Sequence, residues 1–249
     1  MRMIFPEAGG ELDLPGLAEA YAYPRDTWLR ANMVSSADGA AYVDGRSAGL
    51  SSPGDMRIFG ILRVLADVVL AGAGTARAEQ YRPARRRPAL QALREGRPAT
   101  ATVALVSRSL QLDLTAPLFT QTPPDARTIV VTCAASPADL RAKAAEVADV
   151  IVAGEDEVDL PAAVDALAGR GLGRVICEGG PHLLGELAAE HLLDELCLSV
   201  SPTLAGPGAG RITAGVPFPA RPMRLIQVLS EDGFLFCRYV EQERESHEQ

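Results

Sequence analysis

Metal-binding and redox-active residues are scarce in this 249-residue chain, which holds three histidines and four cysteines. No H-x-E motif pairs with a C-x-x-C motif, which excludes zinc-dependent deaminase chemistry. The spacing of the cysteines predicts reduced, buried thiols, and neither a disulfide framework nor a zinc site. We therefore expect no bound metal. The cysteines lie far apart, mostly inside apolar runs that are typical of strands: Cys133, Cys177, Cys197 and Cys237.

Long apolar runs and an excess of basic residues are also missing. No apolar stretch approaches the roughly 20 residues needed to cross a bilayer. The N-terminal segment "MRMIFPEAGGELDLPG" meets acids, glycine and proline too early to form the apolar core of a signal peptide. We therefore expect a cytoplasmic protein that contacts no membrane. The net charge of −8 argues against binding to nucleic acid. A small anionic ligand in a local basic pocket is still compatible with this charge.

The pattern of apolar residues predicts a single α/β domain over residues 27–241, between an irregular lead-in (1–26) and a flexible tail (242–249). Short apolar strands alternate with amphipathic helices, which indicates a mostly parallel central sheet with helices on both faces. Three final strands without intervening helices predict an antiparallel C-terminal edge. The strands are expected at 27–36, 67–72, 102–107, 128–133, 149–154, 174–180, 193–206, 223–233 and 234–241, and the helices at 53–66, 136–148, 159–171 and 181–192.

Three strand ends carry small or polar residues, and ligands of open parallel sheets bind beyond such ends. These ends are "VLAGAGT" (69–75), "ALVSRS" (104–109) and "ICEGG" (176–180). The common dinucleotide fingerprint G-x-G-x-x-G is absent, because Arg77 stands at the place of the third glycine. Each strand end also has a structural interpretation: the glycines could form tight turns, and Ser107 and Arg108 could be surface residues.

Two further features are open to more than one interpretation. Ser52, Pro53 and Asp55 form a favourable helix start. "SPAD" (136–139) repeats this pattern before a helix without other polar features, so capping alone could explain Asp55. The six arginines between residues 82 and 97 are typical of a mobile, solvated loop, although such residues can also bind phosphate.

Taken together and in order, the motifs resemble a known family. "SSADG", "SSPGD", "DVVLAGAGT", "VSRS", "CEGGPHLLGEL" and "LDELCLSVSPTLAGPG" are similar to the reductase domain of riboflavin biosynthesis over residues 27–240. That domain often forms the C-terminal half of a bifunctional deaminase–reductase and shares the dihydrofolate reductase fold. The resemblance implies a stand-alone reductase that uses NADPH. It assigns cofactor binding to Gly72, Gly74, Thr75, Ser107, Arg108, Glu178, Gly179, Gly180 and Leu183.

Within this resemblance, Gly179 and Gly180 would present amides at a helix N-terminus to the cofactor diphosphate. Ser107 and Arg108 would contact the adenosine 2′-phosphate. Dihydrofolate reductases often carry a basic residue within the equivalent of "GAGT", whereas Ala73 stands there in this chain. The preference for NADPH over NADH would then depend heavily on Arg108.

The residues expected to contact the substrate differ from the family pattern. Asn32 replaces the lysine that usually stands six residues before the Asp of Ser-x-Asp-Gly, here Asp38. "AEQYRPARRR" replaces the Asp-Pro-x-Leu-Thr-x-Arg stretch whose arginine helps to hold the ribose phosphate, and Arg85 or Arg86 could substitute for that arginine. Arg63 occupies a phosphate-contacting position of the family. The resemblance thus assigns Asn32, Asp38 and Arg63 to the substrate.

Asp55 is the expected catalytic residue, because dihydrofolate reductases place the acid that binds the pterin ring at this helix start. The favoured substrate is 5-amino-6-(5-phosphoribosylamino)uracil or a related aminopyrimidine. A pterin such as dihydrofolate and a non-catalytic nucleotide-binding module are the alternatives. A homodimer through the alternating apolar residues of 193–206 is expected from the family, although burial within one subunit would explain the same alternation.

Overall fold

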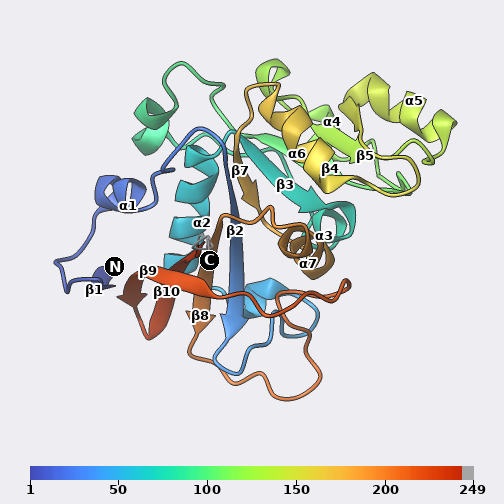
Figure 1. The fold of residues 1–249 in the computed structure, drawn as a ribbon. Coiled ribbons are helices and arrows are strands. Elements are labelled where there is room, and N and C mark those ends of the chain that lie inside the picture. The colour runs from blue at the N-terminus through green and yellow to red at the C-terminus, as the bar shows by residue number, and fades with distance from the viewer. Residues whose placement is uncertain (243–249) are drawn as a thin grey trace, which may run out of the picture.

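The computed structural model describes residues 1–242, so all but the first residue of the expected tail lies outside the described part. A ten-stranded sheet crosses the molecule in the order β1-β9-β10-β8-β2-β7-β3-β4-β5-β6 (Figure 1). Its strands are β1 Arg2–Phe5, β2 Trp28–Ser36, β3 Val68–Gly72, β4 Thr102–Val106, β5 Ile129–Thr132, β6 Asp149–Val152, β7 Arg174–Cys177, β8 Glu195–Ser201, β9 Met223–Glu231 and β10 Phe234–Glu241.

The pairing of the strands confirms the predicted fold class. The seven strands from β8 to β6 in the sheet order run parallel. β10 pairs antiparallel with both β8 and β9, and β9 pairs antiparallel with β1, which forms the expected antiparallel edge. β8 therefore lies inside the sheet, between β2 and β10. The alternating apolar residues Leu196, Leu198 and Val200 are half-buried, whereas the residues between them are buried. The homodimer stays a prediction.

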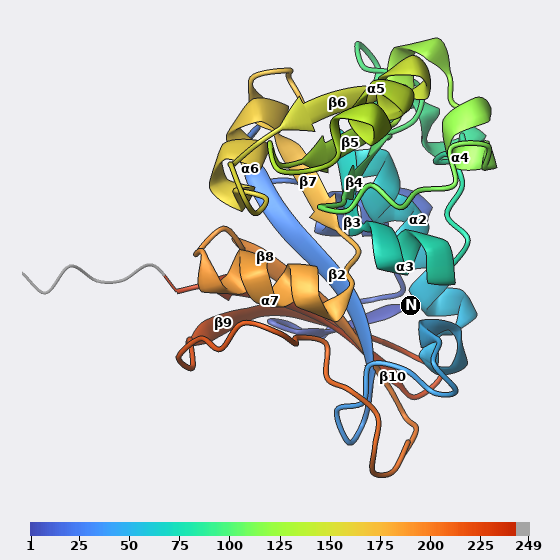
Figure 2. The same cartoon turned by 90° about the vertical axis from the view of Figure 1, so that its right-hand side faces the viewer.

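Helices cover both faces of the sheet (Figure 2). Helix α2 packs with α1 and α5 on one face, and α6 and α7 lie on the other. Val69 and Ala71 of β3 enter the first core, and Val68 and Leu70 enter the second, which explains why this strand is continuously apolar. The helices are α1 Leu14–Ala20, α2 Pro53–Leu65, α3 Ala73–Ala78, α4 Pro117–Thr120, α5 Ala138–Val147, α6 Leu160–Ala168 and α7 Pro181–Ala189, with 3-10 turns η1 Ser47–Leu50, η2 Pro88–Arg94 and η3 Pro124–Ala126.

The expectation of an irregular lead-in over residues 1–26 is wrong. Strand β1 adds to the sheet edge beside β9, and α1 buries Leu17 and Ala18 against the first core. The carboxylate of Asp13 accepts a 2.9 Å hydrogen bond from Gly16 N and caps α1. A four-residue strand and a seven-residue helix are too short to show a clear apolar period, so the sequence pattern did not indicate them.

The arginine-rich segment is not simply a solvated loop. It contains η2, and Arg94 is only 3% exposed. Its guanidinium donates hydrogen bonds to the carbonyls of Val64 (2.8 Å), Ala66 (2.6 Å) and Pro98 (2.6 Å), and so anchors the segment to the C-terminus of α2. Burial, together with the nearby charge of Arg97, lowers the pKa of Arg94 to about 10.

The four cysteines are buried free thiols, as predicted. Burial is the main cause that raises the pKa of Cys177 to about 12, and it also raises the pKa of Cys197 and Cys237. Within residues 1–242, no cluster of three or more histidine, cysteine, aspartate or glutamate residues is arranged to hold a metal ion. No helix in the same range combines the length and apolar character needed to cross a bilayer.

Candidate active site

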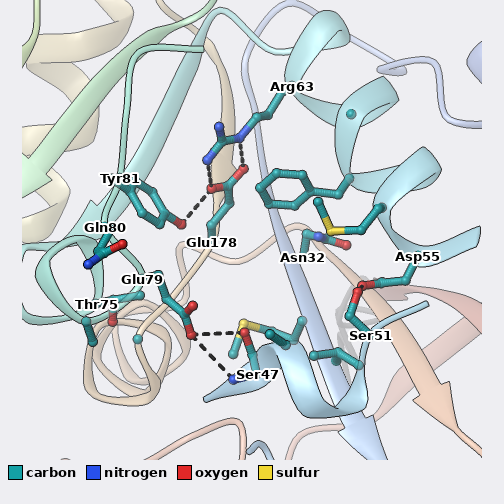
Figure 3. A pocket seen from close by; sticks show the side chains of 18 of the residues that line it. Asn32, Ser47, Ser51, Asp55, Arg63, Thr75, Glu79, Gln80, Tyr81 and Glu178 are labelled. Atoms are coloured by element: carbon teal, nitrogen blue, oxygen red, sulfur yellow. Dashed lines mark hydrogen bonds and ion pairs between the residues drawn. The ribbon is translucent and has the colours of Figure 1, made fainter. Parts of the chain in front are cut away.

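A cavity of about 920 Å³ lies beside β2 and beyond the carboxyl ends of β3 and β7, between α2, the loop after β2 and the segment after α3 (Figure 3). Six of the residues expected from the sequence line it. They come from β2 (Asn32), α2 (Asp55, Arg63), α3 (Thr75) and the turn between β7 and α7 (Glu178, Gly180). The position agrees with the rule that ligands bind at this end of a parallel sheet.

The carboxylate of Asp55 is held at the cavity wall by two hydroxyl groups, one from a neighbouring residue and one from a distant strand. Ser199 Oγ on β8 donates a 2.6 Å hydrogen bond to Oδ1, and Ser51 Oγ donates a 2.5 Å bond to Oδ2. The residue is 7% exposed. Its backbone N–H donates to Ser52 Oγ at 3.1 Å, so the helix cap uses only the main chain of Asp55.

The helix start at "SPAD" does not have the same structure as the start of α2. Helix α5 begins one residue later than the repeated pattern predicts, at Ala138, and has no side-chain cap. Ser136 Oγ donates instead to the carbonyl of Cys133 at 2.7 Å. The side chain of Asp139 is 71% exposed beside Lys143. Capping explains neither the burial of the Asp55 carboxylate nor its contact with β8.

Glu178 and Arg63 form a bidentate ion pair in the cavity wall. Arg63 Nε and Nη2 lie 2.7 and 2.6 Å from the two carboxylate oxygens, and Tyr81 Oη donates to the same carboxylate at 2.7 Å (Figure 3). The side chain of Glu178 is 3% exposed. The resemblance had assigned Arg63 to the substrate and Glu178 to the cofactor, whereas the structure joins them.

This cluster shifts the ionisation of its members. Burial disfavours a charged guanidinium, but the adjacent Glu178 carboxylate more than offsets burial and raises the pKa of Arg63 above its usual range. Burial and then the Glu178 charge raise the pKa of Tyr81 well above its usual value. Tyr81 thus remains a protonated donor, and the positive charge of Arg63 is matched by Glu178.

A second contact joins the two sides of the cavity. Ser47 N and Oγ donate to Glu79 Oε1 at 3.4 and 3.1 Å, which ties the loop after β2 to the end of α3 (Figure 3). Sequence reasoning missed this pair, together with Tyr81, Ser51 and Ser199. Ser199 left no signal in the sequence, because it alternates with Glu195 and Ser201 along β8 and so belongs to the polar side of the pattern, which the structure buries.

Glycines allow the connection between β3 and α3 to lie close to the connection between β7 and α7. Gly72 N donates to Gly179 O at 2.9 Å, and a Cβ on Gly180 would collide with Thr75 Oγ1. Gly179 adopts φ +95°, which favours glycine. Gly72 and Gly74 have no positive φ, because "GAGT" ends β3 and begins α3 instead of forming a glycine turn. A Cβ on Gly74 would meet no atom within 4 Å, so this side of α3 is open.

Other expected residues lie outside the cavity lining. The carboxylate of Asp38 accepts hydrogen bonds from Ser36 Oγ, Ala205 N (3.0 Å) and Gly206 N (2.9 Å), which lower its pKa to about 2. Ser107 Oγ accepts from Leu110 N at 3.1 Å.

Arg108 and Leu183 have different surroundings again. Arg108 pairs with Glu157, and both side chains are largely exposed. Leu183 is 5% exposed and packs in the core beneath α7. The structure thus brings Asp55, Asn32, Arg63 and Glu178 together, and it leaves Arg108 and Leu183 away from the cavity.

The fold and this cavity define a single-domain α/β protein with a ligand-sized cavity at the carboxyl ends of parallel strands. The family model described as the RibD C-terminal domain matches residues 27–233, and the chain belongs to this family. The family expected from the motifs, the reductase domain of riboflavin biosynthesis, is confirmed.

Among curated proteins, the chain is similar to two enzymes named 2,5-diamino-6-ribosylamino-4(3H)-pyrimidinone 5′-phosphate reductase. That of Archaeoglobus fulgidus is 29% identical over 70% of this chain and 80% of the relative. That of Methanothermobacter thermautotrophicus is 27% identical over 70% and 77%. Among solved structures, a pyrimidine reductase-like protein from Corynebacterium diphtheriae has a TM-score of 0.83 at 24% identity, covering 93% of this chain and 99% of that one.

Proposed function

We propose that this protein reduces the ribosylamino group of an aminopyrimidine phosphate, with NADPH as the hydride donor. The observation that carries the proposal is the Asp55 carboxylate, which two hydroxyl groups fix at the wall of a cavity beyond the parallel strands. The names of the two curated relatives support the same substrate class.

The Asp55 carboxylate suits a pyrimidine that carries a 2-amino group. Such a ring presents an N–H₂ donor and a neighbouring ring N–H donor, and a carboxylate can accept both. A uracil ring has a carbonyl oxygen in place of the 2-amino group, and this oxygen would face the carboxylate. We therefore propose 2,5-diamino-6-ribosylamino-4(3H)-pyrimidinone 5′-phosphate as a better substrate than the expected 5-amino-6-(5-phosphoribosylamino)uracil.

The reaction adds a hydride to C1′ of the open-chain imine and a proton to its nitrogen, which gives a ribitylamino group. By binding the ring donors, Asp55 orients the heterocycle and raises the proton affinity of the imine. Asn32 offers both an amide donor and an amide acceptor where the family has a positively charged lysine. Of these two side chains, only Asp55 can therefore place a charged group beside the reacting heterocycle.

The glycines at two strand ends fit a nicotinamide dinucleotide. Open space beside Gly74 leaves the backbone of α3 accessible, and the close approach of Gly180 to Thr75 brings the start of α7 next to α3. Helix α7 directs the N–H groups of its first turn to the same place, where an anionic diphosphate is favoured. Bound there, NADPH would supply the hydride.

The proposal is tested by NADPH oxidation with three substrates side by side: the diamino pyrimidinone phosphate, the uracil phosphate and dihydrofolate. We expect kcat/KM to be highest for the diamino compound, by at least about tenfold over the uracil compound, because the uracil places a carbonyl oxygen, instead of an N–H₂ donor, against the carboxylate. Faster turnover of the uracil compound would contradict the assigned role of Asp55.

Dihydrofolate is the second candidate substrate, and the position of Asp55 at the cavity wall favours it. A pterin presents the same 2-amino and ring N–H donors as the diamino pyrimidinone, so Asp55 fits both. Turnover mainly on dihydrofolate would mean that the protein is a folate-type reductase within a riboflavin-type framework. Cofactor binding without turnover of any of the three compounds would instead support a non-catalytic nucleotide-binding module.

Arg108 provides a test of cofactor preference. We expect Arg108→Ala to weaken NADPH binding by about tenfold and to leave NADH binding nearly unchanged, because only NADPH carries a 2′-phosphate for a charge-assisted hydrogen bond. Arg108 must exchange its partner Glu157 for the phosphate, which limits the net gain. Fluorescence titration with both cofactors measures the effect, and equal losses would rule out a 2′-phosphate contact.

A further inference from the structure

The arginines that line the cavity differ in how their charge is balanced. Arg63 is neutralised by the bidentate pair with Glu178. Arg82, Arg85 and Arg87 also line the cavity and are exposed. Within residues 1–242, no carboxylate lies within ion-pairing distance of these three side chains. The cavity lining therefore carries positive charge that no described carboxylate pairs with, and Arg87 brings part of this charge to the middle of α2.

Arg87 is distinguished from the other two by the place where its guanidinium rests. A Cβ on Gly60 would collide with this guanidinium, so the group lies directly against the backbone of α2. Glycine is unfavourable in the middle of a helix, and Gly60 is a buried, central residue of α2. The close approach of Arg87 gives a physical reason for a glycine at this position.

The position of Gly60 also relates Arg87 to Asp55. Both Asp55 and Gly60 are on α2 and line the same cavity. At the rise of an α-helix, five residues place Gly60 about 7.5 Å beyond Asp55 along the axis. A pyrimidine bound to Asp55 would have room for its pentose along α2 before its phosphate reached Arg87.

We propose that Arg87, seated on Gly60, is the residue that selects the phosphate of the substrate, in place of Arg63. This inference rests on the proposed reduction of a phosphorylated aminopyrimidine. An unpaired guanidinium can offer two parallel N–H groups to a phosphate. Arg63 already makes this bidentate bond to Glu178. Moving Arg63 to the phosphate would leave the buried carboxylate of Glu178 without its charge partner. Arg85, which lines the cavity, supports the same phosphate, whereas Arg86 lies outside the lining.

The test compares the phosphorylated substrate with its dephosphorylated form. We expect Arg87→Ala to lower the ratio of their kcat/KM values by about 10- to 100-fold, mainly through a higher KM for the phosphorylated form, because a charge-assisted bidentate contact is lost. The matched control is Arg86→Ala, which removes the same charge from the neighbouring position and should leave this ratio within about twofold of the wild type. An unchanged ratio in Arg87→Ala overturns the inference.

A second variant tests the contact between Arg87 and Gly60 without removing the arginine. Gly60→Ala should displace the guanidinium of Arg87 and lower the same ratio, although alanine is the better helix former. In the Arg87→Ala background, Gly60→Ala should cause no further fall, because the two changes act on one contact. Additive losses in the kcat/KM ratio would contradict a direct contact between Arg87 and Gly60. Wild-type protein that turns over neither form overturns the proposed function and this inference together, whereas activity with an unchanged ratio in Arg87→Ala overturns the inference alone.

Discussion

Asp55→Asn is expected to lower kcat by about 10²- to 10³-fold, which is the size of effect seen when a positioned catalytic group or charge is removed. Asparagine has almost the same shape, and its backbone N–H keeps the cap from Ser52. However, one carboxylate oxygen becomes an N–H₂ donor. This donor would face the ring donors of the substrate, so the pair that orients the heterocycle is lost.

The affinity for NADPH should change little in Asp55→Asn, because the carboxylate is held by the hydroxyls of Ser51 and Ser199, neither of which is assigned to the cofactor. Steady-state kinetics and a cofactor titration on the same preparation separate the two effects. Asp139→Asn is the matched control: it changes an exposed acid in the first turn of another helix. Equal losses of turnover, cofactor affinity and thermal stability would show that Asp55 has only a structural role.

The largest effect on stability is expected at a buried ionic cluster on β2, β8 and β10. Glu195 is fully buried and accepts hydrogen bonds from Trp28 Nε1 (2.9 Å), Arg30 Nη2 (2.8 Å) and Arg238 Nε (2.7 Å). Glu195→Gln would leave two buried arginines without their shared carboxylate. We expect the free energy of unfolding to fall by about 3–5 kcal/mol.

Urea denaturation of the wild type and the variant measures this loss. Glu146→Gln, at an exposed position of α5, is the control and should change stability by no more than about 0.5 kcal/mol. A similar small change in Glu195→Gln would mean that the cluster contributes little net free energy, as when desolvation cancels the attraction between its charges.

The same cluster predicts how stability depends on pH. Burial alone would raise the pKa of Glu195, but Arg30 and Arg238 outweigh burial and lower it from 4.5 to about 2. The stabilisation by the carboxylate is therefore fully present above about pH 4.5 and is lost as the pH falls toward about 2. Glu195→Gln should flatten the fall in stability across this range. An equally steep fall in the variant would assign the acid sensitivity to other carboxyl groups.

Much of the fold was predictable because burial imposes a pattern on the sequence. Strands that are covered on both faces must be continuously apolar, and β3 could be recognised for that reason. The start of α2 was evident from Ser52 and Pro53, since capping depends on neighbouring residues. By contrast, β1 and α1 depend on contacts with β9 and the first core, and such contacts leave little local pattern.

The candidate site was predictable in its position but not in its pairings. The sequence by itself determined the parallel sheet, the family motifs and the presence of Asp55 at a helix start. Only the tertiary structure joined Arg63 to Glu178, 115 residues apart, and Asp55 to Ser199, 144 residues apart. It also placed Arg87 against Gly60 and left it without a carboxylate partner in the described chain. Local patterns fix strands and caps because neighbours in sequence are neighbours in space, whereas the charge balance of a cavity depends on residues that meet only after folding.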